Sequence, residues 1–363
     1  MKRKLCIDLR WIDCSGIGTY IKGLMPGLSA VLSDVDIVGL GSMERLSGFS
    51  WAHARNFSVV DCRAGRYSMA EQFVLPLAIP RDTDLFFSPH YPIPLLYRGR
   101  FAVTVHDLSH VVVPEIADNL VKRAYAKTML RNVRLRASLI LTVSNFSKKE
   151  LLRCTRGSRA DNIVTVYEGV SDEWYDAAQS DRPHDRPYLV YVGNIKPYKN
   201  VSRLVEAFLS VMGAVPHDLV IVGQHDGLIT GESEGFFARA RSAGNRIQFT
   251  GQVSQDQLLA FVGNADALVM PSLYEGFGFP PLEAMAAGVP TLVSRAASLP
   301  DVCGDATLYC DPLSVEGIGA GIVSILTDEA LRRRLICAGK EQARKYSWGL
   351  CAQQTASAIR TIL

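Results

Sequence analysis

The first half of the chain alternates short apolar runs with segments in which apolar residues recur at helical spacing. The runs Leu5–Leu9, Val35–Leu40, Leu85–Ser88, Phe101–Val105 and Leu139–Val143 are apolar at most positions. Strands that are apolar on both faces are typical of a parallel sheet covered by helices, because neither face meets water. We therefore predict five buried parallel strands here, with helices between several of them.

The second half repeats this alternation more clearly and adds a local signal for a helix start. Ser254 is followed three residues later by Gln257, the spacing of a capping box. Alternating strands and helices predict an α/β fold with parallel sheets covered on both faces. Six strands are predicted in this half, at Tyr188–Val192, Leu219–Val222, Ile247–Phe249, Ala267–Met270, Thr291–Val293 and Thr307–Tyr309.

Between the two halves, the segment Ser171–Pro187 loses the apolar periodicity and is rich in Asp, Gln, Ser, His and Pro. This composition is typical of a linker. A chain of 363 residues is also too long for one comfortable core and suits two domains. We predict doubly wound domains over 1–172 and 187–346, which would bind ligands at the carboxyl ends of their strands.

Composition narrows the class of protein. A hydrophobic content of 48% with 21% charged residues is that of a globular protein. The net charge of +3, from 39 basic and 36 acidic residues, carries no general signature of nucleic-acid binding. No apolar run reaches the ~18 residues of a membrane span. Asp8 interrupts the first apolar run after a basic start, so we expect a first strand there and not a signal peptide.

Eight cysteines are scattered along the chain without a C-x-x-C pair. Several lie in apolar patterns, where a free cysteine behaves as a small hydrophobic residue. We therefore expect reduced thiols, as in the cytosol, and no zinc site.

One loop in the second half has the composition of a phosphate site. It follows the predicted strand Ala267–Met270, contains Gly276 and Gly278, and leads into Pro280 and Pro281. Proline is favoured in the first turn of a helix, because its missing N–H would be unpaired there. Glycines let backbone N–H groups approach a ligand closely. A strand, a glycine loop and a helix start together predict an anion-binding site.

Two carboxylates flank this loop, Glu275 before the glycines and Glu283 after the prolines. We expect Glu283 in the first helical turn, where the helix dipole stabilises a carboxylate. The string from Glu275 to Glu283, continued by Ala-Met-Ala, resembles the signature of the retaining family 4 glycosyltransferases. The alternative is an ordinary strand–loop–helix with two surface glutamates. The resemblance implies the GT-B fold, in which two Rossmann-like domains face a central cleft, and the transfer of a sugar from a nucleotide-sugar donor.

A second motif follows the strand Tyr188–Val192. Lys196 and Lys199 lie in the loop before a helix that we expect to open near Asn200, where a lysine can meet a diphosphate. Lys199 matches the lysine that the family places here. The family's arginine is replaced by Asn194, and Lys196 is a candidate for the missing charge, although a solvated loop lysine is the alternative.

The first half contributes candidates at two strand ends. His106 and Asp107 follow the strand Phe101–Val105, and the resemblance implies that this histidine contacts the transferred sugar. His90 and Tyr91 lie in a proline-rich loop after another strand. With Asp107 they are candidates for binding the acceptor.

Gly16 and Gly18 follow the first strand and open a helix, which suits contact with the donor. Ile21 stands where a third glycine would complete a dinucleotide fingerprint, so the pattern argues against a nicotinamide dehydrogenase. A tight turn without a ligand is the alternative for these two glycines.

The resemblance also implies a division of roles. Lys199 and the backbone amides of Gly276, Phe277 and Gly278 would neutralise the leaving diphosphate, and Glu283 would hold the ribose. Glu275 and His106 would hold the donor sugar. The last helix, about 347–363, would pack back on the N-terminal domain through Trp348.

In detail the motifs resemble the branch that contains O-antigen mannosyltransferases. This implies GDP-mannose as donor, a saccharide or lipid-linked saccharide as acceptor, lipopolysaccharide biosynthesis as context, and no metal or other cofactor. Two alternatives stay open, an epimerase on the same fold and a non-catalytic protein that binds nucleotide sugars.

A basic helix predicted over Leu120–Arg136 bears on localisation. An amphipathic helix with this charge can lie on an anionic membrane surface, and a solvated face of an ordinary helix is the alternative. We expect a cytoplasmic protein, with the inner face of the membrane as the place of any peripheral association.

Overall fold

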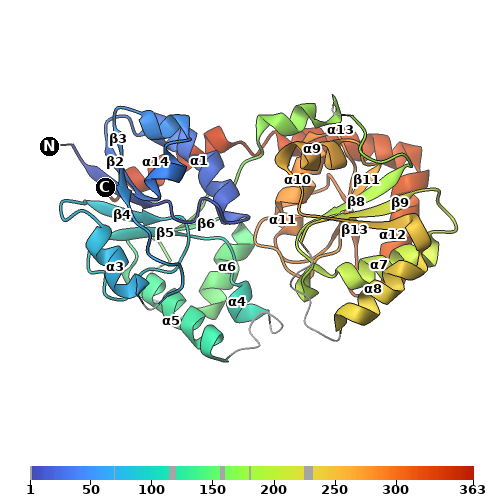
Figure 1. The fold of residues 1–363 in the computed structure, drawn as a ribbon, viewed down its shortest axis with the longest axis horizontal. Helices are drawn as coiled ribbons and strands as arrows, with labels where there is room; N and C mark the ends of the chain where they lie inside the picture. Colours follow the sequence, from blue (N-terminus) through green and yellow to red (C-terminus); the bar gives the residue numbers. More distant parts are fainter. Residues whose placement is uncertain (1, 69, 114–119, 156–159, 180, 225–231) are drawn as a thin grey trace. The chain divides into compact units, whose positions relative to one another are not determined.

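The structure is a computed structural model, and it describes residues 2–68, 70–113, 120–155, 160–179, 181–224 and 232–363. The chain divides into two units (Figure 1). The first consists of Met1–Gly169 and Ser347–Leu363, and the second of Val170–Tyr346. Each unit is described by itself.

The first unit is built on a seven-stranded parallel sheet with the order β3-β2-β1-β4-β5-β6-β7. The central strands β4, β5 and β6 are buried at every position, as their continuous apolar runs predict. The strands are β1 (Lys4–Asp8), β2 (Asp36–Gly41), β3 (Phe57–Asp61), β4 (Leu85–Ser88), β5 (Phe101–Val105), β6 (Leu139–Thr142) and β7 (Ile163–Thr165).

Two strands of this sheet, β3 and β7, were not predicted from the sequence. Both lie at the edges of the sheet, and both are partly exposed along their length. An edge strand that faces water on one side lacks the continuous apolar run by which the central strands are predicted.

Helices cover both faces of this sheet (Figure 1). Leu5 and Ile7 point to the face covered by α1 and α14, whereas Cys6 and Phe86 point to the face covered by α3 and α5. The helices are α1 (Ile17–Val31), α2 (Met43–Leu46), α3 (Glu71–Ala78), α4 (Ser109–Val112), α5 (Leu120–Arg136), α6 (Asn145–Cys154) and α14 (Trp348–Arg360), with a 3-10 turn η1 at Ser50–His53.

The last helix packs on the first one, as the resemblance implied. Gly23 of α1 makes room for Trp348, because a Cβ atom there would lie 2.1 Å from the indole ring. Gly27 approaches Ala352 in the same way. Trp348 is therefore the anchor of α14 on this unit.

The second unit has a six-stranded parallel sheet with the order β10-β9-β8-β11-β12-β13. All six predicted strands are confirmed, and β8 and β11 begin and end where predicted. The strands are β8 (Tyr188–Val192), β9 (Asp218–Val222), β10 (Ile247–Gly251), β11 (Ala267–Met270), β12 (Thr291–Ser294) and β13 (Leu308–Cys310).

The helices of the second unit follow the strands in alternation, and the capping box of Ser254 and Gln257 at the start of α9 is confirmed. The helices are α7 (Val201–Val211), α8 (Glu232–Ser242), α9 (Gln255–Gly263), α10 (Phe279–Ala286), α11 (Leu299–Cys303), α12 (Val315–Thr327) and α13 (Glu329–Ala343), with 3-10 turns η2 (Asp172–Gln179), η3 (Pro197–Lys199) and η4 (Gly244–Arg246).

The segment Ser171–Pro187 differs from the expected linker. The chain changes units earlier, at Gly169–Val170, and much of the segment forms the 3-10 turn η2. Trp174 of this turn is buried, and η2 packs on α9 and α10. A single buried tryptophan is enough to dock a short polar segment, and it leaves no apolar periodicity to be detected in the sequence.

Each sheet reverses its strand order at one place. In the first unit β1 lies between β2 and β4, and in the second β8 lies between β9 and β11. Loops that leave the two sides of such a switch point separate and leave a crevice at the carboxyl ends of the strands. His90 and Tyr91 follow β4, and Lys199 and Glu275 lie in the loops that follow β8 and β11. His106 and Asp107 follow the next strand of the first sheet, β5.

Candidate active site

In the second unit, the two loops that follow β8 and β11 bring a lysine and a glutamate together. Lys199 ends the turn η3, and its Nζ lies 2.8 and 2.7 Å from the two carboxylate oxygens of Glu275. The backbone N–H of Leu273 donates to the Tyr198 carbonyl at 2.8 Å and ties the loops to each other. Two residues that are 76 positions apart in the chain thus form one charged pair.

This pair is partly exposed, with 20% of the Lys199 side chain and 10% of the Glu275 side chain accessible to water. An ammonium group has three N–H donors, and Glu275 accepts two of them. The pair can therefore exchange one partner for another anion without burying an uncompensated charge.

Asn200 holds the Lys199 loop in place, although the sequence suggested no role for it. Its backbone is left-handed, with φ at 63°, and its side-chain amide donates to the carbonyls of Pro271 and Pro312 at 2.9 and 2.7 Å. Asparagine tolerates this conformation better than other non-glycine residues. The indication available in the sequence was that an asparagine directly follows Lys199 where a helix was expected to open.

The glycine loop ends in a helix start, as predicted. Gly278 is the N-cap of α10 with φ at 107°, and Pro280 lies within the first turn. A Cβ atom at Gly278 would lie 2.8 Å from Leu299, so both the backbone conformation and the space require glycine. Phe277 is buried against Phe279 and Tyr346, and its carbonyl accepts from Ser298. Its side chain therefore belongs to the core.

We had expected Glu283 in the first turn of α10, but this prediction is wrong. The helix begins at Phe279, so the carboxylate comes one turn later and the helix has no acidic residue in its first turn. Burial and the neighbouring charge of Glu173 raise the pKa of Glu283 to about 8. A protonated carboxyl at neutral pH can donate a hydrogen bond as well as accept one.

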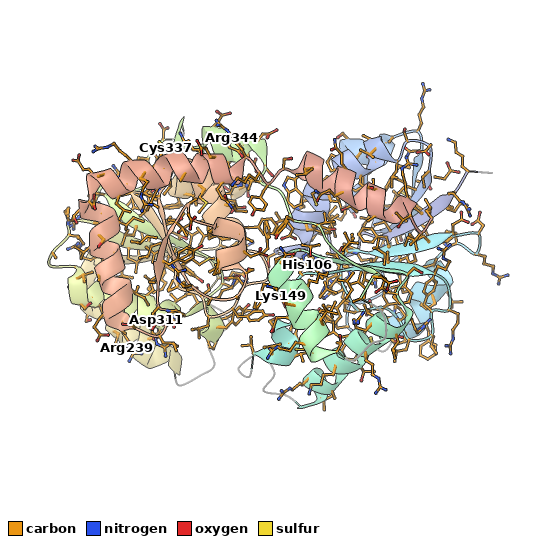
Figure 2. The ribbon with its side chains drawn as sticks, turned by 180° about the vertical axis from the view of Figure 1, so that it is seen from behind. His106, Lys149, Arg239, Asp311, Cys337 and Arg344 are labelled. Carbon is orange, nitrogen blue, oxygen red and sulfur yellow. The ribbon has the colours of Figure 1, made fainter. Side chains whose placement is uncertain are left out.

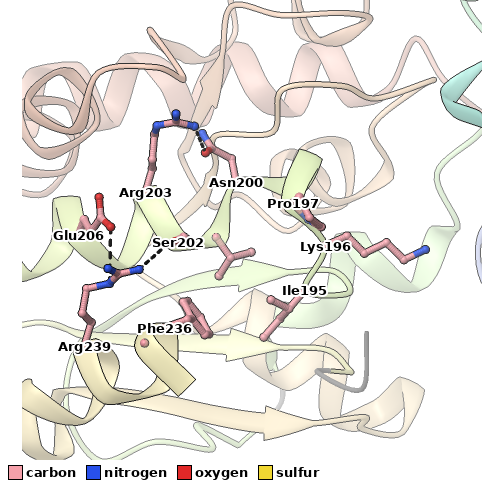
Figure 3. Close-up of a pocket in the computed structure, with 11 residues that line it drawn as sticks. Ile195, Lys196, Pro197, Asn200, Ser202, Arg203, Glu206, Phe236 and Arg239 are labelled. Carbon is pink, nitrogen blue, oxygen red and sulfur yellow. Dashed lines mark hydrogen bonds and ion pairs between the residues drawn. The ribbon is translucent and has the colours of Figure 1, made fainter. Parts of the chain in front are cut away.

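Asn194 and Lys196 lie in the same loop as Lys199, before the turn η3. The Asn194 carbonyl accepts a hydrogen bond from Tyr191 at 3.4 Å, and Lys196 is exposed. Lys196 borders a pocket of about 480 Å³ whose wall includes the ion pair between Glu206 and Arg239 (Figure 3). Figure 3 shows the Lys196 side chain extended away from that ion pair.

In the first unit, His106 follows β5 and uses both ring nitrogens (labelled in Figure 2). Nδ1 lies 3.0 Å from Glu168, and Nε2 lies 2.8 Å from the Pro89 carbonyl. A carbonyl only accepts, so Nε2 carries a hydrogen, while Nδ1 and Glu168 share one proton. Burial lowers the pKa of His106, but the hydrogen bond and charge of Glu168 outweigh it and raise the pKa, which favours the imidazolium.

Glu168 is the functional candidate that the sequence did not reveal. It is 62 residues from His106 in the chain and is buried. The sequence carried no local signal for this pair, because folding alone brings the two residues together.

The three candidates for acceptor binding have different surroundings. His90 and Tyr91 are buried, and Tyr91 lines a pocket of about 670 Å³. Burial lowers the pKa of His90 well below its ordinary value, so the ring is neutral. The Asp107 carboxylate accepts a hydrogen bond from the N–H of Ser109, the first residue of α4, at 2.9 Å.

The two glycines at the start of α1 have separate tasks. Gly16 is the helix N-cap with φ at 73° and is exposed. A Cβ atom at Gly18 would lie 2.4 Å from the Ile12 carbonyl oxygen, so Gly18 allows a close backbone approach. Gly16 is therefore the one of the two that can present backbone groups to a ligand.

The basic helix α5 divides into two sets of side chains. Arg123, Lys127 and Arg131 are exposed. Arg134 is buried and donates to Thr155, whereas the Arg136 guanidinium binds the Tyr97 carbonyl. The last two arginines therefore stabilise the fold and do not contribute to a basic surface.

The described residues contain neither a cluster of metal ligands nor a helix suited to span a membrane. No group of three or more histidine, cysteine, aspartate or glutamate side chains in this part of the chain is arranged to hold a metal ion. Among the same residues, no helix combines the length and the apolar character that crossing a membrane requires.

Comparison with known proteins places this geometry in a family. Residues 172–342 match the family model of the glycosyl transferases group 1. The chain is 32% identical over 292 residues to the O-antigen chain mannosyltransferase B of Escherichia coli, which covers 77% of this chain and 74% of that protein. The chain belongs to the group 1 glycosyltransferases.

Two further similarities agree with this assignment. The glycosyltransferase is 28% identical over 232 residues to the O-antigen chain mannosyltransferase RfbU of Salmonella typhimurium, covering 64% of this chain and 62% of that one. Its fold matches the sucrose-phosphate synthase of Thermosynechococcus elongatus with a TM-score of 0.77 at 20% identity, over 99% of both chains. The predicted GT-B fold is thereby confirmed.

Proposed function

We propose that this glycosyltransferase is a retaining mannosyltransferase that takes mannose from GDP-mannose and passes it to a saccharide during O-antigen synthesis. The observation that carries this proposal is the Lys199–Glu275 pair beside the N-terminus of α10. The names of the two mannosyltransferases similar to this chain support the choice of sugar.

In this proposal the second unit neutralises the leaving diphosphate. Lys199 supplies a point charge, and the backbone of Gly276–Gly278 supplies N–H donors at a helix N-terminus. Donors that are already in position where charge develops lower the barrier without reorganisation. Glu275, which Lys199 orients, would hold a hydroxyl of the donor sugar, and the protonated Glu283 carboxyl would bind the ribose.

We also propose that His106 contacts a hydroxyl of the transferred sugar. Because its Nε2–H donates to the Pro89 carbonyl, a sugar hydroxyl would have to share that hydrogen. His90 and Tyr91 are the proposed neighbours of the acceptor. We further propose that transfer needs no metal cofactor, so that the rate is unchanged by EDTA.

For the acceptor we propose a lipid-linked saccharide, reached at the cytoplasmic face of the membrane. The exposed cations Arg123, Lys127 and Arg131 support this, together with Val121, which is 76% exposed on the same helix. Binding to vesicles with anionic lipid, which weakens in Arg123→Glu and not in Glu44→Gln, tests the surface. Equal binding to neutral vesicles would contradict it.

The function is tested first by thermal shift with GDP-, UDP- and dTDP-sugars. A ligand at 100 times its Kd stabilises the native state by about 2.7 kcal/mol. We expect stabilisation by GDP-mannose and mannosyl transfer with retention of the anomeric configuration, followed by NMR of the product. Stabilisation by another nucleotide sugar alone, or an inverted product, would overturn the proposal.

A further inference from the structure

Three charged side chains are buried together where β1 ends. The Arg10 guanidinium donates to both oxygens of Asp8 at 2.8 and 2.7 Å and to Glu71 at 2.7 Å. Each of the three side chains is at most 3% accessible to water. Taking such charges out of water costs about as much as their attraction returns, so a buried ion network is weak evidence for a role in stability.

The second oxygen of Glu71 holds the backbone of a different residue. It accepts a hydrogen bond from the N–H of Tyr67 at 2.9 Å. Tyr67 has a left-handed backbone with φ at 57°, which a bulky side chain rarely adopts. Such a conformation persists where the surroundings impose it, and these residues gather at functional sites. Here the Glu71 carboxylate, which Arg10 also binds, holds the backbone of Tyr67 in this conformation.

This backbone conformation directs the Tyr67 ring into the buried side of the first unit's strand-end loops. The Tyr67 hydroxyl lies 2.8 Å from Nε2 of His90. The indole of Trp11 meets both rings edge-on, with centroids 5.1 Å from Tyr67 and 4.8 Å from His90. Tyr67 and Trp11 therefore both contact the His90 ring.

His90 has another unusual property. Its Nδ1 atom is buried and has no hydrogen-bond partner among the described residues. A histidine left to itself would turn its ring toward a better-paired arrangement, because an unpaired buried polar group is costly. The contact with Tyr67 therefore holds the ring against this tendency.

The chain of contacts continues to His106. The carbonyl of Pro89, directly before His90, accepts from Nε2 of His106, and the two imidazole rings lie 6.4 Å apart. Tyr67 also lines the 670 Å³ pocket together with Tyr91. Tyr67 is thus the residue at which the buried charges, the pocket and the two histidines meet.

We propose that Asp8, Arg10 and Glu71 are positioning residues, which hold Tyr67 in its left-handed conformation so that its hydroxyl fixes His90 beside His106. The proposal rests on the function proposed above, in which these two histidines face the acceptor and the transferred sugar. It adds that Tyr67 determines how the acceptor is held, and that Glu71 acts through Tyr67.

The test compares Tyr67→Phe and Glu71→Gln with a matched control, Asp84→Asn. Asp84 also accepts a backbone N–H with its carboxylate, that of Lys4 at 2.7 Å, but it precedes β4 at the amino end of the sheet. We expect both test variants to raise the acceptor KM about tenfold while the donor KM stays within twofold, and Asp84→Asn to change neither. Glu71→Asp should recover part of the loss.

A second readout does not depend on the substrate. In ¹⁵N NMR spectra of the histidine side chains, Tyr67→Phe removes the group bound to Nε2 of His90, so the ring nitrogen signals of His90 should move to those of another tautomer. The same change is expected in Glu71→Gln and not in Asp84→Asn. Because Tyr67→Phe deletes one hydroxyl from a residue that is 51% exposed, it should fold even where Glu71→Gln does not.

The outcomes separate the two proposals. If the wild-type protein transfers no sugar but the His90 signals move as described, the proposed function fails and the positioning contact stands. If a folded Tyr67→Phe variant keeps both the acceptor KM and the His90 signals of the wild type, the positioning role is overturned. Equal losses in Asp84→Asn would also overturn it, since they would show a general effect of removing a carboxylate.

Discussion

The two units hold their charged groups in opposite ways at equivalent strand ends. In the second unit, Lys199 and Glu275 face each other beside a helix N-terminus and remain partly exposed. In the first unit, Asp8, Arg10 and Glu71 are almost completely buried and bonded to the backbone around them. The difference indicates that exposure to water determines whether an ion pair can exchange one partner for a ligand.

An exposed pair can take up a new partner, because water and the ligand compensate the charges during the exchange. A buried network cannot be opened without leaving a charge unpaired in a medium of low polarity. We therefore assign ligand exchange to the Lys199–Glu275 pair and orientation to the buried network. The predictions below test this distinction, from the largest expected effect to the smallest.

The largest effect is expected at Lys199. Lys199→Ala removes the cation from the proposed diphosphate site, and charge-assisted contacts are worth about 1.5–3 kcal/mol. We expect kcat/KM for the donor to fall roughly ten- to a hundredfold with little change in melting temperature. Steady-state kinetics and thermal unfolding measure the two quantities.

Lys196→Ala is the control for this variant, because Lys196 is an exposed lysine in the same loop. It should keep near-wild-type kinetics. Equal losses in both variants would show that the loop needs positive charge in general, and a large fall in stability in Lys199→Ala would assign the pair to the fold.

The next effect concerns the His106–Glu168 pair. Glu168→Gln removes the carboxylate that raises the pKa of His106, so that pKa should fall. If the imidazolium is the active form, activity is lost as pH rises through this pKa, and the loss should begin at lower pH in the variant. We expect a lower rate at pH 7.5, because a smaller fraction of His106 is then protonated. A pH–rate profile and an NMR titration of His106 test this.

The matched control is His184→Gln, which breaks a second histidine–carboxylate pair, with Asp218 at 2.9 Å in the other unit. Its pH–rate profile should coincide with that of the wild type. An unchanged His106 titration in Glu168→Gln would refute the coupling.

A smaller effect should distinguish the two glycine N-caps. Gly16 and Gly278 both have a positive φ, but a Cβ atom at Gly16 meets no atom within 4 Å, whereas at Gly278 it would lie 2.8 Å from Leu299. Gly16→Ala should therefore cost about 1 kcal/mol from backbone strain alone. Gly278→Ala should cost about 2 kcal/mol, because the same strain is joined by displacement of Leu299. Urea unfolding measures both, and a reversed order would contradict the reasoning.

The last effect is expected from Glu283→Gln and is spread over several pH units. The pKa of Glu283, raised to about 8, means that its contribution to stability is present below its ordinary value near 4.5 and is lost as pH rises through 8. The wild type should therefore lose stability relative to the variant over this range. The difference should grow by about 1.4 kcal/mol for each pH unit between these two values. Each such step corresponds to a melting-temperature difference of roughly 2–4 °C.

Glu329→Gln, at a position where the side chain is 82% exposed, should show no such trend with pH. If the melting temperatures of the wild type and Glu283→Gln run parallel from pH 4.5 to pH 9, the carboxyl is not protonated in the native state.

Local patterns in the sequence were sufficient to predict the central strands and the strand ends that carry the candidate residues. The apolar runs of β4, β5, β8 and β11 predict their bounds without error, because a strand buried on both faces leaves a continuous signal. Since strand ends are local, His106, Lys199 and Glu275 could be placed in strand-end loops. The edge strands β3 and β7 and the docked turn η2 lacked such a signal.

The sequence by itself determined the positions of the central strands, the helix start after Gly278 and the residue types available at each loop. The tertiary structure alone decided which side chains contact each other. Glu168 reaches His106 across 62 residues, and Arg10 reaches Glu71 across 61. A side chain's partner and its pKa depend on burial and on charges brought close by folding, and neither is written in local spacing. For this reason the raised pKa of Glu283 and the contact between Tyr67 and His90 could be recognised in the folded chain and not before.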